Sequence, residues 1–116
     1  MKSKLAYVAG PYSARTKLGV LLNIRRARKV AKILWGNGYT VICPHSNSAF
    51  MENISNDEFI QRDLSLVGRC DVIFVLPGWQ KSKGTREEIR YAGLLGKDII
   101  MLGDISDARG FTEGIS

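Results

Sequence analysis

The strongest structural signal in this 116-residue chain is the stretch Asp71-Val72-Ile73-Phe74-Val75-Leu76. Five apolar residues follow the aspartate, without the alternation of apolar and polar side chains that marks a strand with one wet face. Such a run is typical of a central parallel strand that is covered on both faces. The stretch therefore predicts an α/β fold, in which helices lie on either side of a parallel sheet.

Weaker signals on both sides of this stretch extend the pattern. Apolar runs predict three more strands, over residues 5–9, 39–43 and 98–102. Apolar residues at three- and four-residue steps predict three helices, over residues 17–35, 56–68 and 85–95. Strand and helix alternate, so we expect one domain over residues 1–116. It should be a three-layer sandwich with a short parallel sheet of about four strands, flavodoxin-like or Rossmann-like. Residues 45–55, 77–83 and the tail from Gly103 are predicted to be irregular.

The chain is basic, with 17 Lys and Arg against 11 Asp and Glu, a net charge of +6 and a pI near 9.6. This balance favours an anionic partner, such as nucleic acid, a membrane surface or a phosphorylated small molecule. Much of the excess charge lies on the predicted helix 17–35, mostly opposite its apolar stripe. No aromatic side chains interleave with these cations, so a solvated face is favoured over a nucleic-acid surface.

Several classes of protein are disfavoured by what the sequence lacks. No apolar run reaches the roughly 18–20 residues of a membrane helix and no signal peptide is recognisable, so we expect a cytoplasmic protein without membrane contact. Cys43 and Cys70 fall in or beside apolar runs and are expected to be buried thiols. Together with His45 they lack the spacing of a metal site, and His45 has no nucleophilic partner that spacing points to. Neither a Walker phosphate loop nor a GxGxxG turn occurs, and no cofactor is expected.

Ligands of parallel sheets bind beyond the carboxyl ends of the strands, where the strand order reverses. Three predicted loops emerge at that edge, over residues 10–16, 44–55 and 77–84. They hold most of the side chains that are suited to binding or catalysis, and the helix that follows the third loop begins with two adjacent glutamates, Glu87 and Glu88.

Four ordered segments between Tyr7 and about Leu102 carry a resemblance to a known family. They are Tyr7-Val8-Ala9-Gly10-Pro11-Tyr12-Ser13, then Asn23 and Ala27 followed by Gly38-Tyr39-Thr40-Val41, then Arg62-Asp63-Leu64 followed by residues 69–75, and finally Gly84-Thr85-Arg86-Glu87-Glu88-Ile89-Arg90-Tyr91-Ala92. In their order and spacing these segments resemble the nucleoside 2-deoxyribosyltransferase-like superfamily. The resemblance implies a small-molecule nucleoside or nucleotide substrate and the cleavage or transfer of its N-glycosidic bond.

The resemblance also implies a pair of catalytic carboxylates. Glu88 matches the glutamate that attacks the anomeric carbon and forms a covalent glycosyl-enzyme intermediate, and Asp63 matches an aspartate that orients the sugar or protonates the leaving base. Tyr7 matches a tyrosine that hydrogen-bonds the glutamate. The phrase Glu-Ile-Arg-Tyr-Ala selects Glu88 over Glu87, although the family often has glycine where this chain has Arg90.

Part of this assignment has support from the residues themselves. A carboxylate nucleophile must be ionised. Glu88 is predicted in about the first turn of its helix, where free backbone N–H groups favour negative charge. Lys81, Lys83 and Arg86 add positive potential nearby. The competing interpretations are an ordinary acid at a helix N-terminus for Glu88, a surface acid for Asp63 and a core aromatic residue for Tyr7.

The same loops provide candidates for substrate binding. Members of the family that require a 5′-phosphate bind it at the first loop, which here holds Gly10, Ser13 and Arg15. Further donors lie on the third loop: Lys81, Ser82, Lys83 and Gly84. Tyr12 and Trp79 are candidates to stack on the base.

Alternatives stay open on the sequence alone. Hydrolase and transferase are not separated by spacing. Family members complete their sites with a neighbouring subunit, so we expect a homo-oligomer, with Thr112 and the carboxylate of Ser116 able to reach a partner. Leu76-Pro77-Gly78 followed by Gly84-Thr85 and the glutamates also loosely resembles nucleotide phosphoribohydrolases of the lysine-decarboxylase-like fold. A non-catalytic nucleotide sensor and, less favoured, a nucleic-acid-binding protein are the remaining alternatives.

Overall fold

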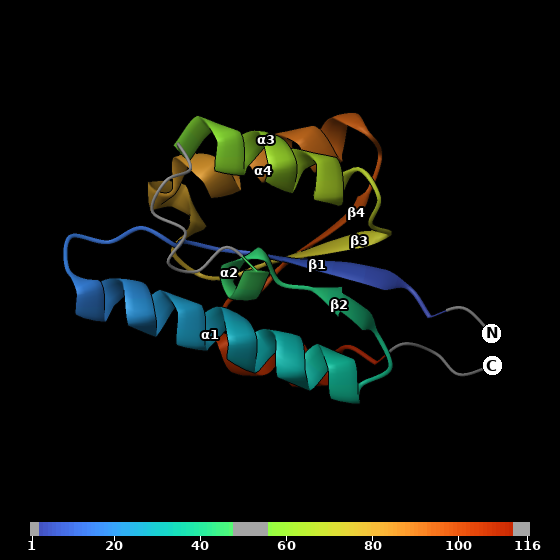
Figure 1. Cartoon of the computed structure of the whole chain (residues 1–116). Coiled ribbons are helices and arrows are strands. Elements are labelled where there is room, and N and C mark those ends of the chain that lie inside the picture. The colour runs from blue at the N-terminus through green and yellow to red at the C-terminus, as the bar shows by residue number, and fades with distance from the viewer. Residues whose placement is uncertain (1–2, 48–55, 113–116) are drawn as a thin grey trace.

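The computed structural model describes residues 3–47 and 56–112 and confirms the α/β prediction (Figure 1). Four parallel strands form one sheet in the order β2-β1-β3-β4. The strands are β1 (Leu5–Ala9), β2 (Thr40–Ile42), β3 (Val72–Val75) and β4 (Asp98–Met101). The chain moves outward from β1 to β2 and then crosses back to β3 on the other side of β1. The order therefore reverses between β1 and β3, which is where ligands of such sheets bind.

Helices cover both faces of the sheet and make the three layers (Figure 1). One face carries α1 (Lys17–Gly36) together with the 3-10 helix η2 (Ile105–Gly110). The other face carries α3 (Asn56–Val67) and α4 (Lys83–Leu94), which pack side by side. The described helices include none that is both long enough and apolar enough to cross a membrane.

The two apolar layers follow from the alternation of side chains along β1. Ala6 and Val8 pack with the buried stripe of α1, whereas Tyr7 and Ala9 pack toward α3 and α4. The central strand β3 divides in the same way and is buried at every position, with Phe74 completely enclosed. The continuous apolar run that marked this strand in the sequence is thus explained by burial on both faces.

Helix boundaries follow local chemistry. The Thr16 hydroxyl begins α1 by accepting a hydrogen bond from the Gly19 backbone N–H at 3.0 Å. Asn37 caps the other end, and Gly38 then turns the chain with a left-handed φ of 100°. The predicted helix 17–35 is therefore confirmed to within one residue.

Three segments that were predicted to be irregular contain short helices. Pro44–Asn47 forms α2, Trp79–Lys81 forms the 3-10 helix η1, and η2 occupies much of the C-terminal tail. The prediction for the tail was wrong because Asp104 and Asp107 form a capping box and Ala108 is fully buried against the α1 face of the sheet. The rest of the predicted loop 45–55 lies outside the described residues, as does Ser116.

Candidate active site

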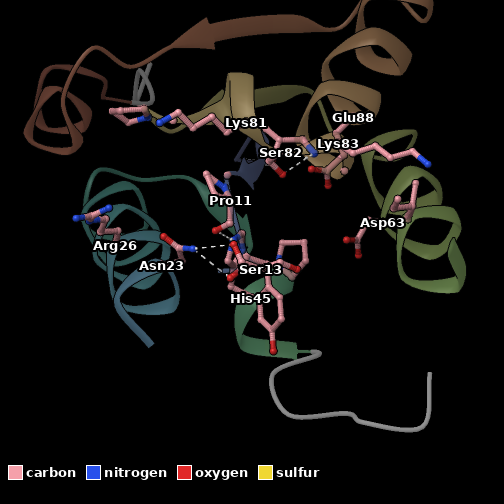
Figure 2. Close-up of a pocket in the computed structure, with 18 residues that line it drawn as sticks. Pro11, Ser13, Asn23, Arg26, His45, Asp63, Lys81, Ser82, Lys83 and Glu88 are labelled. Carbon is pink, nitrogen blue, oxygen red and sulfur yellow. Dashed lines mark hydrogen bonds between the residues drawn. The ribbon is translucent and has the colours of Figure 1, made fainter. Parts of the chain in front are cut away.

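A cavity of about 640 Å³ lies at the carboxyl ends of the strands, at the point where the strand order reverses (Figure 2). Residues that directly follow β1, β2 and β3 line it, together with residues of α1, α3 and α4. Its lining comprises Gly10, Pro11, Tyr12, Ser13, Asn23, Arg26, Pro44, His45, Ile60, Asp63, Pro77, Gly78, Lys81, Ser82, Lys83, Gly84, Thr85 and Glu88. Its volume is within the range of small-molecule sites.

The first loop is held in place by side chains from two other elements. Asn23 of α1 donates a hydrogen bond to the Tyr12 carbonyl at 3.1 Å. The Nε2 atom of His45 lies 3.0 Å from the Pro11 carbonyl and donates to it. A Cβ atom on Gly10 would lie 3.0 Å from the Leu76 side chain, which is tighter than an ordinary contact, so glycine favours the close approach of this loop to the end of β3.

His45 lines the cavity beside the first loop, and the hydrogen bonding of its ring is incomplete. Its ring is buried, and burial lowers the pKa of the imidazole below its usual value, which keeps the ring neutral. With Nε2 donating to Pro11, Nδ1 is an acceptor, and it has no hydrogen-bond partner among residues 3–47 and 56–112. His45 therefore serves to fix the first loop, a role that its sequence context did not predict.

Glu88 lies on α4, on the side of the helix that faces β1. It is 6% exposed, and Tyr7 donates its hydroxyl hydrogen bond to the Glu88 Oε2 atom. Tyr7 reaches it because it is on the α3/α4 side of β1 and is completely enclosed. The contact predicted between these two residues is present in the structure.

The protonation state of Glu88 differs from the sequence-based expectation. Burial raises the pKa of Glu88 to about 8, an effect that the hydrogen bond from Tyr7 opposes and the charge of Asp63 reinforces. The helix begins at Lys83, two residues before the predicted start, so Glu88 is the sixth residue of α4, beyond the free N–H groups of the first turn. Lys81, Lys83 and Arg86 form no ion pair with Glu88 in the described structure. The structure therefore does not support the expectation that the helix N-terminus and the nearby cations hold Glu88 ionised.

Asp63 faces the same cavity from α3. Partial burial raises the pKa of this carboxyl to about 6, and its charge contributes to the raised pKa of Glu88. Figure 2 shows Asp63 and Glu88 on the same side of the cavity, carried by neighbouring helices. Two acids with raised pKa values lining one cavity are typical of a site that handles a proton.

Tyr7 stays protonated throughout the physiological range. Burial raises the pKa of its hydroxyl well above the usual value, and the neighbouring charge of Glu88 raises it further. The hydroxyl can therefore act toward Glu88 as a hydrogen-bond donor and has no tendency to lose its proton.

Seven of the nine predicted substrate-binding residues line the cavity: Gly10, Tyr12, Ser13, Lys81, Ser82, Lys83 and Gly84. Arg15 is exposed and does not line it. Trp79 is also outside the lining, because its side chain packs against the apolar layer between the sheet and the α3/α4 pair. Of the two side chains predicted to stack on a base, only Tyr12 lines the cavity, and its ring centroid lies 5.9 Å from that of His45.

Sequence reasoning did not select Arg26 or Thr85 as site residues. The sequence context of Arg26 groups it with the solvated cations of α1. Its position on the same side of the helix as Asn23 is the signal that could have assigned it to the site. Thr85 is buried and donates its hydroxyl to Ser82 Oγ at 2.8 Å, which supports the start of α4. Residues 3–47 and 56–112 contain no group of three His, Cys, Asp or Glu residues placed to hold a metal ion.

The sequence of this chain matches the model of a known protein family. The model described as "Domain of unknown function (DUF4406)" matches residues 4–101. The chain belongs to this family. The match spans all four strands and every residue that lines the DUF4406 cavity. No curated protein sequence matches the chain.

Solved structures share the fold of this DUF4406 chain. A 2-deoxyribosyltransferase from the psychrotolerant bacterium Bacillus psychrosaccharolyticus matches with a TM-score of 0.66 and 17% identity, over 96% of this chain and 99% of that one. A 2-desoxiribosyltransferase from Leishmania mexicana matches with a TM-score of 0.59 and 24% identity, over 85% of this chain; the DUF4406 chain spans 63% of its length. A CMP N-glycosidase, BcmB, from Clostridium botulinum matches with a TM-score of 0.59 and 20% identity, over 94% and 83% of the two chains. At these identities the likeness establishes the fold, which is the one that the sequence resemblance implied.

Proposed function

We propose that this protein breaks the N-glycosidic bond of a nucleoside or nucleoside 5′-monophosphate, with Glu88 as nucleophile. The observation that carries the proposal is the buried Glu88, hydrogen-bonded by Tyr7 and lining with Asp63 a cavity at the switch point of the sheet. Burial of a carboxylate costs free energy, so a buried glutamate at a cavity wall favours a functional role. Two acids that line one cavity also suit the nucleophile and the proton donor of glycoside cleavage. The fold shared with deoxyribosyltransferases and a CMP N-glycosidase supports the same chemistry.

The reaction proceeds in two steps that balance. In the first, a Glu88 carboxylate oxygen bonds to the anomeric carbon, the bond from that carbon to the base nitrogen breaks, and the leaving base takes a proton from Asp63. In the second, water or another base attacks the anomeric carbon and breaks its bond to Glu88, and the proton of the attacking group passes to Asp63. The first step needs Glu88 ionised and Asp63 protonated.

Tyr7 positions the nucleophile in this scheme. Its hydrogen bond fixes one oxygen of Glu88, which leaves the other oxygen for attack. The hydrogen bond also stabilises the ionised form of Glu88, the form that attacks. Tyr12, Asn23 and His45 shape the opposite wall, because they hold or form the first loop.

The test is the release of free base from a panel of nucleosides and nucleoside 5′-monophosphates. We expect release from at least one member, lost in Glu88→Ala and strongly reduced in Asp63→Asn. Glu87→Ala is the matched control, because Glu87 neighbours Glu88 in sequence but does not line the cavity and pairs with Arg90 at 3.6 Å. A folded protein that releases no base from any member would refute the proposal and favour the nucleotide-sensor alternative.

A second arm separates hydrolysis from transfer. A labelled free base is added at rising concentration while the product is followed. A transferase incorporates the label into new nucleoside, whereas a hydrolase releases free sugar at an unchanged rate.

A further inference from the structure

The cavity has a positively charged side that the proposed chemistry does not use. Arg26 lines it from α1, three residues after Asn23, which holds the first loop. Because α1 covers one face of the sheet and α3 and α4 cover the other, Arg26 and the two acids approach the cavity from opposite layers. Figure 2 shows Arg26 and Asp63 at opposite sides of the cavity.

The charge of Arg26 is not compensated within the described residues. Among these residues an ion pair is found between Arg90 and Glu87 on α4, and none is found for Arg26. Lys81, on η1, adds a second positive charge to the same cavity, from the loop after β3. The two acids thus line the cavity from α3 and α4, and Arg26 and Lys81 line it from α1 and η1. Lys83, the first residue of α4, adds a positive charge on the side of the acids (Figure 2).

We infer that Arg26, assisted by Lys81, binds the phosphate of a nucleoside 5′-monophosphate and so determines the substrate class of the site. This inference rests on the proposed function. A guanidinium presents paired N–H donors that match phosphate oxygens. Because Arg26 lies across the cavity from Asp63 and Glu88, a phosphate bound at Arg26 leaves the glycosidic bond of the ligand toward Glu88.

Arg15 does not compete for this role in the structure. Both arginines are exposed, but Arg15 precedes α1 and lies outside the cavity lining, whereas Arg26 is part of the lining. The family resemblance implied a phosphate site at the first loop, with Gly10, Ser13 and Arg15. Gly10 and Ser13 line the cavity, and our inference assigns the charged phosphate contact to Arg26 in place of Arg15.

Calorimetric titration of the full chain tests the inference without turnover. The Glu88→Gln protein is titrated with a 2′-deoxynucleoside, its 5′-monophosphate and inorganic phosphate. We expect the monophosphate to bind at least about tenfold tighter than the nucleoside, because its charged oxygens accept stronger hydrogen bonds than a neutral hydroxyl does. Arg26→Ala should abolish that preference and leave nucleoside affinity unchanged, and Arg26→Lys should retain part of it.

Arg25→Ala is the matched control. Arg25 is the preceding exposed cation of α1 and does not line the cavity, so its loss should leave both affinities unchanged. Equal loss of monophosphate affinity in Arg25→Ala and Arg26→Ala would show that the preference for the monophosphate comes from the general positive charge of α1, and it would overturn the inference. Equal binding of nucleoside and monophosphate by the parent protein, or an equal loss of both in Arg26→Ala, would overturn it as well.

The outcome is distinguishable from a failure of the proposed function. An Arg26-dependent preference for the monophosphate, without base release from any nucleotide, would retain the binding site and refute the chemistry. Base release from uncharged nucleosides, with no preference for the phosphate, would retain the chemistry and refute the anion site.

Discussion

At the scale of single residues, Glu88 and Asp63 compete for a proton. The pKa of Glu88 is raised to about 8 and that of Asp63 to about 6, so near pH 7 the pair favours one shared proton, held mostly by Glu88. The proposed attack needs the reverse arrangement, with the proton on Asp63 and Glu88 ionised. A bound substrate that offers its base nitrogen to Asp63 would shift that balance.

This coupling predicts the pH dependence of catalysis. We expect kcat/KM for base release to follow a bell-shaped curve, rising with an apparent pKa near 6 and falling with one near 8, values that belong to the pair. In Asp63→Asn the falling limb should disappear, because no acid remains to be deprotonated. A flat profile between pH 5 and 9 in the parent protein would rule out a shared proton.

The burial of Glu88 also predicts a cost in stability. The folded-state pKa of Glu88 is above its unfolded value, so its stability contribution is full below about pH 4.5 and is lost as pH rises through about 8. Glu88→Gln keeps the size of the side chain and an oxygen for Tyr7 to donate to. We expect this variant to be more stable than the parent above pH 8, by on the order of a few kcal/mol.

Urea denaturation at pH 5, 7 and 9 measures that difference. The stabilisation by Glu88→Gln should grow with pH and level off above about 8. A pH-independent difference would show that Glu88 has the same charge in the folded and the unfolded chain. Glu87→Gln, on the half-buried side of the same turn, controls for the removal of one acid from α4.

At the scale of elements, the start of α4 sets the depth of Glu88. Ser82 caps the helix, and its Oγ accepts hydrogen bonds from the Thr85 backbone N–H at 3.3 Å and the Thr85 hydroxyl at 2.8 Å. Ser82→Ala should destabilise the protein by about 1 kcal/mol, and Ser82→Thr should retain most of the stability because it keeps the accepting oxygen. Thermal denaturation of the parent and the two variants measures this difference. Equal melting temperatures of Ser82→Ala and the parent would show that the Ser82 cap does not stabilise the start of α4.

The same element shows what sequence reasoning could and could not predict. Periodicity located α1, α3 and α4 and the four strands, since each has a continuous apolar stripe or run. The start of α4 was placed two residues late, because Lys83 and Gly84 carry no helix signal and the cap at Ser82 is only apparent once Thr85 folds back on it. The error mattered, since it moved Glu88 away from the helix N-terminus that was expected to stabilise its charge.

At the scale of the whole molecule, the strand order β2-β1-β3-β4 gathers the site. Loops that are far apart in sequence meet because β1 lies between β2 and β3 and all strands run the same way. Alternation of strands and helices predicted a parallel sheet but not which strands are neighbours. The contact of Tyr7 with Glu88 was implied by family resemblance, whereas the cation at Arg26 became apparent only from the packing of α1 against the sheet.

The oligomeric state remains a prediction. Leu18, Leu21 and Leu22 are exposed near the start of α1, with 66%, 44% and 40% of each residue accessible. We expect the protein to associate through this apolar surface, with a mass in light scattering above the 12.9 kDa of one chain. Leu22→Lys should shift the species toward monomer, and a parent protein that is monomeric at all concentrations tested would contradict the prediction.

The nucleophilic role of Glu88 is tested most directly by intact-protein and peptide mass spectrometry after rapid acid quenching during turnover. We expect a covalent adduct with the mass of the substrate's sugar, or sugar phosphate, on the peptide that contains Glu88. The adduct should be absent in Glu88→Gln and present in Glu87→Gln. Base release in single-turnover experiments with no adduct at any time, or an adduct located on another residue, would contradict the proposed mechanism.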